Sequence, residues 1–65
     1  MSKMGKIYKV IDKNHGYIID INGNLYLFSS FDIIDDTKIK EGLPVLFKVK
    51  EDLVLRATYI SSVNG

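Results

Sequence analysis

Apolar side chains recur along this chain in short runs, and turn-forming residues separate one run from the next. Residues 6–11 and 15–21 form the first two runs, and Asn22, Gly23 and Asn24 follow the second. An Asn-Gly pair supplies the positive φ angles that a tight hairpin turn requires. Helical periodicity is hard to find, whereas β-branched and aromatic residues are frequent. The pattern predicts a meander of short β-strands.

A third run, residues 25–29, follows the Asn-Gly turn at once. Because strand side chains alternate with a period of two, Leu25 and Leu27 share one face of this run, and Tyr26 and Phe28 share the other. We expect the aliphatic pair to lie in the core. The two aromatic rings would then face solvent.

The second half of the chain predicts a long connection and two more strands. Residues 30–42 lack clean alternation, so we expect a loop with one helical turn at residues 31–34. Pro44 then opens an alternating run, and residues 53–60 form the last strand, followed by a frayed tail at residues 61–65. The side chains of the Pro44 run that we expect to face inward are Val45, Phe47 and Val49.

Five short strands in a chain of 65 residues favour a closed barrel, because an open sheet would leave two edges unpaired. Three hairpin-linked strands, a long crossing and two more strands match the OB topology. We therefore predict one domain over residues 1–65, an all-β, five-stranded antiparallel OB-fold barrel. An SH3-like barrel also has five strands, and periodicity does not separate the two.

Composition argues against several classes of protein. The chain has no cysteine and one histidine, so it can form neither a disulfide nor a structural zinc site of the usual kind. No apolar run approaches the roughly 20 residues that span a bilayer, and we expect a soluble, cytoplasmic protein. The sequence contains no nucleophile elbow and no phosphate-binding glycine loop. We expect neither enzymatic activity nor a cofactor.

The net charge of +1 does not by itself indicate a polyanion as partner, but the charges are unevenly distributed. Three aspartates, Asp32, Asp35 and Asp36, cluster in the middle of the chain. Four lysines lie in its first fifth: Lys3, Lys6, Lys9 and Lys13. The first strand is therefore expected to be basic.

Residues 13–18 read Lys-Asn-His-Gly-Tyr-Ile, and residues 25–28 read Leu-Tyr-Leu-Phe. These segments are similar to the two RNA-binding motifs, K-G-F-G-F-I and V-F-V-H, of the cold-shock domain family, which the chain resembles between Gly5 and Ile60. The segments at 5–7, 41–47 and 56–60 are similar to the family's G-K-V, E-G-Q-x-V-x-F and Q-A-x-N-V. The chain departs from the family in having no tryptophan, and in carrying Asn14 and His15 where the first motif has glycine and phenylalanine.

The resemblance implies binding of single-stranded RNA or DNA, in which unpaired bases stack on exposed rings and cations neutralise phosphates. If residues 15–21 and 25–29 pair as a hairpin, their aromatic side chains share an outward face, and Tyr8 extends it. The candidate nucleic-acid-binding residues are Lys6, Tyr8, Lys9, Lys13, His15, Tyr17, Tyr26, Phe28 and Arg56. The implied role is that of an RNA chaperone or a regulator of transcription or translation.

A second hypothesis uses the same barrel as a protein-interaction module or a homodimer. Its apolar patch would consist of Tyr17, Tyr26, Phe28 and Leu46. The near-neutral charge and the missing tryptophan favour this alternative. The role of Phe31 also stays open, because this ring either plugs the barrel end or stacks on a base.

Overall fold

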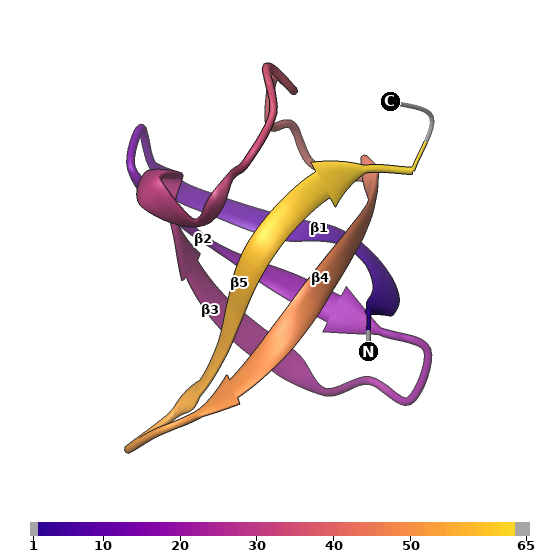
Figure 1. Cartoon of the computed structure of the whole chain (residues 1–65), viewed down its shortest axis with the longest axis vertical. Coiled ribbons are helices and arrows are strands. Elements are labelled where there is room, and N and C mark those ends of the chain that lie inside the picture. Colours follow the sequence, from indigo (N-terminus) through magenta and orange to yellow (C-terminus); the bar gives the residue numbers. More distant parts are fainter. Residues whose placement is uncertain (1, 64–65) are drawn as a thin grey trace.

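Five β-strands close into a barrel in the computed structural model, which describes residues 2–63 (Figure 1). The strands neighbour one another in the order β1-β2-β3-β5-β4, and pairing of β1 with β4 closes the ring. The elements are β1 (Lys3–Asp12), β2 (His15–Asp20), β3 (Leu25–Ser29), the 3-10 helix η1 (Ser30–Asp32), β4 (Pro44–Glu51) and β5 (Leu55–Ser62).

The predicted fold class is confirmed at the level of an all-β, closed five-stranded barrel, consistent with an OB-fold or an SH3-like barrel. Four of the five neighbouring strand pairs are antiparallel, as predicted, whereas β3 and β5 pair in parallel through Leu27 and Arg56. The reason is geometric. In a closed ring with an odd number of strands, directions cannot alternate all the way round, so one neighbouring pair must be parallel.

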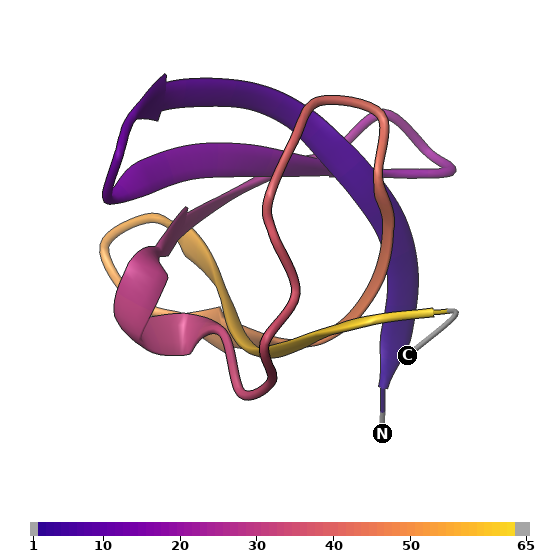
Figure 2. The ribbon, with the colours of Figure 1, turned by 90° about the horizontal axis from the view of Figure 1, so that it is seen from above.

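Strand β1 curves around the barrel and pairs with β2 along one edge and with β4 along the other (Figure 2). Gly5 lies where both neighbours meet it, opposite Asp20 and Val45. A Cβ atom at this position would lie 2.6 Å from the Ile19 carbonyl oxygen, closer than real Cβ atoms approach. Gly5 therefore permits the tight curvature that closes the barrel.

The core is thin, as expected for a chain of this length. Its buried hydrophobic residues are Ile7, Ile18, Tyr26, Phe28, Val45, Phe47, Ala57 and Ile60. The prediction that Val45 and Phe47 face inward is confirmed. The prediction for Val49 is wrong, because this side chain is 40% exposed. Pairing with β1 ends at Phe47, and beyond that point β4 pairs with β5 alone.

The inside-outside prediction for β3 is also wrong. Tyr26 and Phe28 are buried, with exposed fractions of 4% and 3%, whereas Leu25 is exposed. The register with β2 explains the difference, because Phe28 lies opposite Gly16 and its ring occupies the space a side chain would fill there. Tyr26 packs against Phe47, with ring centroids 5.1 Å apart. Two large rings fill a thin core better than two leucines would.

The long connection between β3 and β4 contains the one helical turn expected, starting a residue earlier as η1. Beyond it, Ile33 forms a parallel bridge with Ile60. Phe31 is 95% exposed and does not plug the barrel. At the other end, β5 continues to Ser62, so Ser61 pairs with Leu46 rather than fraying, and residues 64–65 of the expected tail lie outside the described residues.

We predict that Phe47→Ala unfolds the barrel. Truncating a buried phenylalanine costs about 3 to 5 kcal/mol, comparable to the roughly 3 to 10 kcal/mol total stability of a domain of this size. Thermal melts followed by circular dichroism would test this, with Leu53→Ala as the control because Leu53 is 100% exposed. Equal melting temperatures for both variants would contradict the assignment of Phe47 to the core.

Candidate nucleic-acid interface

Strand register brings a tyrosine and two cationic residues into one row across the outside of the barrel. Lys9 of β1 lies opposite Tyr17 of β2, Tyr17 lies opposite Leu27 of β3, and Leu27 lies opposite Arg56 of β5. Cross-strand partners project from the same face of a sheet, so these four side chains are neighbours on the outer surface. The ring of Tyr17 therefore has a cation on its β1 side and an aliphatic side chain on its β3 side.

A β-bulge adds a second ring to this surface. The β1–β2 register shifts between Ile7 and Lys9, which leaves Tyr8 as the extra residue. The bulge keeps Ile7 in the core while Tyr8 and Lys9 are both exposed. We call the resulting surface the basic face; its residues are Lys6, Tyr8, Lys9, Lys13, His15, Tyr17 and Leu27.

His15 lies at one end of the basic face, beside an acid. Its Nδ1 is 3.1 Å from Asp12 Oδ1, and the same carboxylate oxygen accepts a hydrogen bond of 2.7 Å from the Asn14 backbone N–H. The Asn14 hydrogen bond, followed by that of His15, lowers the pKa of the Asp12 carboxyl below its ordinary value. This negative charge reduces the attraction of the His15 end for phosphate, whereas Lys13 in the adjoining turn is exposed.

The predicted phosphate ligand Arg56 has a partner within the protein. Its Nη2 is 3.7 Å from Asp32 Oδ2, which also accepts a hydrogen bond from the Ser29 backbone N–H at 2.9 Å. Arg56 thus ties η1 to β5 and is half-buried. Its position beside Leu27 agrees with the predicted approach to the rings, but part of its charge is compensated.

Two residues of the predicted set do not belong to the interface. Tyr26 and Phe28 lie in the core and have no ring face available to a base. The strand pattern predicted a core position for Leu27, which instead lies partly exposed on this face, and the role of Phe31 had stayed open. The sequence could have indicated the exposure of Phe31, because this aromatic residue stands among the polar residues Ser29, Ser30 and Asp32, outside the alternating pattern of the strands. The backbone N–H of Ser30 donates to the Asn14 carbonyl, which joins the start of η1 to the turn before His15, and Phe31 of η1 is exposed.

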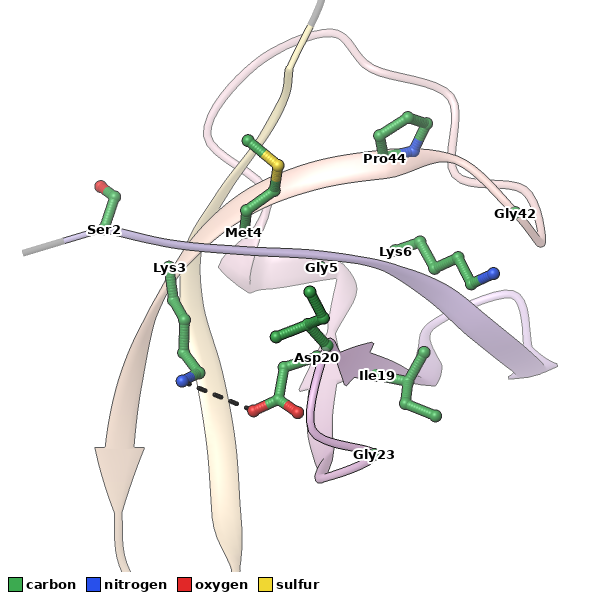
Figure 3. A pocket seen from close by; sticks show the side chains of 11 residues that line it. Ser2, Lys3, Met4, Gly5, Lys6, Ile19, Asp20, Gly23, Gly42 and Pro44 are labelled. Atoms are coloured by element: carbon green, nitrogen blue, oxygen red, sulfur yellow. Dashed lines mark ion pairs between the residues drawn. The ribbon is translucent and has the colours of Figure 1, made fainter.

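A hollow of about 860 Å³ opens at the N-terminal end of β1, between that strand, the β2–β3 turn and Pro44. Figure 3 shows Asp20 at its base, where Lys3 Nζ lies 3.5 Å from the carboxylate. The Tyr26 hydroxyl donates to Asp20 Oδ2 at 2.7 Å, and the backbone N–H groups of Asn22 and Asn24 donate to Oδ1. Both oxygens of the Asp20 carboxylate therefore accept hydrogen bonds that stabilise the turn and the buried Tyr26. The acid at the base of the hollow has a structural role.

The hydrogen bonds set the ionisation of this pair. The Tyr26 hydroxyl holds the pKa of the Asp20 carboxyl well below its usual range, against the opposing effect of burial. Burial, together with the bond to Asp20, raises the pKa of the Tyr26 hydroxyl. Both groups therefore keep their ordinary charge states at neutral pH.

Within residues 2–63, no helix is long and apolar enough to cross a membrane. In the same residues, no three histidine, cysteine or acidic side chains gather where they could hold a metal ion.

We predict that Asp20→Asn lowers the melting temperature at neutral pH and weakens its dependence on acid. The folded pKa of Asp20 is depressed, so its charge stabilises the fold above the unfolded value of about 3.9, and this contribution is lost as pH falls through the acid range. Melting temperatures between about pH 7 and pH 3 would test this. Asp36→Asn, at an exposed carboxylate, is the control. Parallel acid profiles for Asp20→Asn and the unmodified protein would refute the assignment.

No protein-family model matches the sequence, and no curated protein matches it. The resemblance to the cold-shock domain family therefore stays a prediction made from residues. The structure itself establishes a closed five-stranded barrel with an aromatic and cationic row on its outer surface.

Proposed function

We propose that this protein binds single-stranded RNA or DNA on the basic face. The observation that carries the proposal is the row of Lys9, Tyr17, Leu27 and Arg56, in which Lys9 lies next to the tyrosine and Arg56 lies beyond Leu27. Single-stranded nucleic acid is recognised by this combination, because bases stack on rings while cations lie along the phosphates.

The lysines of the basic face are available for phosphate. The ion pairs found among residues 2–63 involve Lys3, His15 and Arg56, and none involves Lys6, Lys9 or Lys13. Lys6 and Lys9 lie on β1 with Tyr8, and Lys13 lies in the following turn. Lys9 is the residue opposite Tyr17 of β2. Their arrangement supports a strand path along β1, with bases directed toward the two rings.

With Tyr26 and Phe28 in the core, the stacking surface is smaller than the sequence predicted. It consists of Tyr8, Tyr17 and His15. We expect broad base selectivity, since every base offers a π-face. A protein that binds only unpaired strands shifts hairpins toward their open state by mass action, so the proposed role is a cytoplasmic RNA chaperone.

The protein-interaction alternative has a different basis from the one predicted. The patch of Tyr17, Tyr26, Phe28 and Leu46 does not form, because its two middle members are buried. Instead, exposed hydrophobic residues gather at the end of the β4–β5 hairpin, on either side of Glu51 and Asp52; they are Val49, Leu53, Val54 and Leu55. A protein partner would dock there, and such binding should persist or tighten as salt rises.

We expect the protein to bind fluorescent oligothymidine and mixed-sequence single-stranded RNA, with affinity that falls steeply between low and physiological salt. Fluorescence anisotropy titrations would measure this, with a duplex of the same sequence as competitor. Absence of binding at every salt concentration would reject the proposed function and favour the hairpin-tip alternative.

We further expect Tyr17→Ala to weaken binding by about tenfold, because one base–ring stacking contact is lost. Ile21→Ala is the matched control, since Ile21 is exposed on the β2–β3 turn and is not a residue of the basic face. Melting temperatures of both variants would establish that the barrel is intact. Equal affinities for the two variants would show that Tyr17 does not stack on a base.

A further inference from the structure

Tyr59 of β5 has a backbone conformation that its own side chain disfavours. Its φ is 51°, and it is the only non-glycine residue between positions 2 and 63 with a positive φ. A bulky residue in this left-handed region is an outlier, and such outliers concentrate at functional positions. The residue is 60% exposed, so burial in the core does not account for the choice of tyrosine.

A β-bulge produces this conformation. The β4–β5 register passes from Leu46↔Ser61 to Lys48↔Thr58, so two residues of β5, Tyr59 and Ile60, lie opposite one residue of β4. The extra residue turns Ile60 fully into the core and leaves Tyr59 on the outside. At the position of Tyr59 in this bulge, glycine would adopt the positive φ with less strain than tyrosine.

A lysine accompanies the exposed ring. The Nζ of Lys48 lies 5.2 Å from the centroid of the Tyr59 ring. Lys48 belongs to none of the ion pairs found in the described part of the chain. The pair thus repeats, on β4 and β5, the combination of ring and uncompensated cation that the basic face has on β1 and β2.

The two aromatic sites are connected by cations. Lys50 lies opposite Arg56, the last member of the row that contains Tyr17. Lys48 follows on the same side of β4, about 7 Å further along the strand. Beyond Lys50, at the hairpin tip, Glu51 and Asp52 would repel phosphate. In the opposite direction along β4, Lys48 lies beside Tyr59.

We propose that Tyr59 and Lys48 form a second stacking site, which holds a further base of the same nucleic-acid strand. A strand long enough to extend beyond the basic face passes Arg56, places phosphates beside Lys50 and Lys48, and stacks a base on Tyr59. This inference rests on the proposed function. It assigns to the β4–β5 side of the barrel the binding of longer single strands, whereas short strands occupy the basic face alone.

The test uses Tyr59→Gly with oligothymidines of about four and about twelve nucleotides. We expect the longer oligonucleotide to bind the unmodified protein more tightly than the shorter one. Tyr59→Gly should weaken binding of the longer oligonucleotide by about fivefold or more, without affecting the shorter one. Its melting temperature should stay the same or rise, because glycine accepts the positive φ. Tyr59→Phe keeps the ring and should bind both lengths as the unmodified protein does.

Undiminished affinity of Tyr59→Gly for the longer oligonucleotide would overturn the second site. A fall in melting temperature with equal losses of affinity at both lengths would also overturn it, because Tyr59 would then act through the fold. If the unmodified protein binds both lengths, Tyr17→Ala weakens both and Tyr59→Gly weakens neither, the second site fails while the basic face stands. If the unmodified protein binds neither length, the proposed function fails together with this inference.

Discussion

The pairing of Gly16 with Phe28 determines which side of β2 and β3 faces the core. Gly16 has no side chain, and the Phe28 ring fills the space left beneath β2. Because side chains alternate along both strands, this contact also turns Tyr26 inward and Tyr17 and Leu27 outward. A register shifted by one residue would reverse all of these positions. The position of the Tyr17 ring at the surface is therefore a consequence of packing within the barrel.

The sequence predicted those features that local patterns determine. The Asn22-Gly23 turn, the five strands and the inward positions of Val45 and Phe47 follow from turn chemistry and period-two alternation. The faces of β3 could not be predicted in this way, because both of its faces carry large apolar side chains. Only the partner strand, with its glycine opposite Phe28, distinguishes them. The same holds for Val49, whose exposure depends on where the pairing of β1 with β4 ends.

The candidate site could be predicted only where it depends on local strand patterns. Lys6, Tyr8, Lys9 and Tyr17 were assigned to one surface from the strand pattern, and the β1–β2 register places Lys9 opposite Tyr17. The ion pair between Arg56 and Asp32 could not be foreseen, since it joins β5 to a helical turn far away in the sequence. Folding thus divides the cations of a nearly neutral chain into two groups. Lys3 and Arg56 stabilise the structure, whereas Lys6, Lys9 and Lys48 have no acidic partner among residues 2–63.

The odd number of strands has a mechanical consequence. The parallel contact it forces between β3 and β5 is a single residue pair, Leu27 and Arg56, whereas each antiparallel neighbour pair extends over several residues. With only this residue pair, the β3–β5 contact has the shortest ladder in the barrel, and the bridge between Ile33 and Ile60 and the ion pair between Arg56 and Asp32 reinforce it. If a nucleic-acid strand binds along the proposed path from Tyr17 to Tyr59, it crosses this contact. Such a strand would link β3 to β5 from outside, and binding would then make the barrel harder to open at this contact.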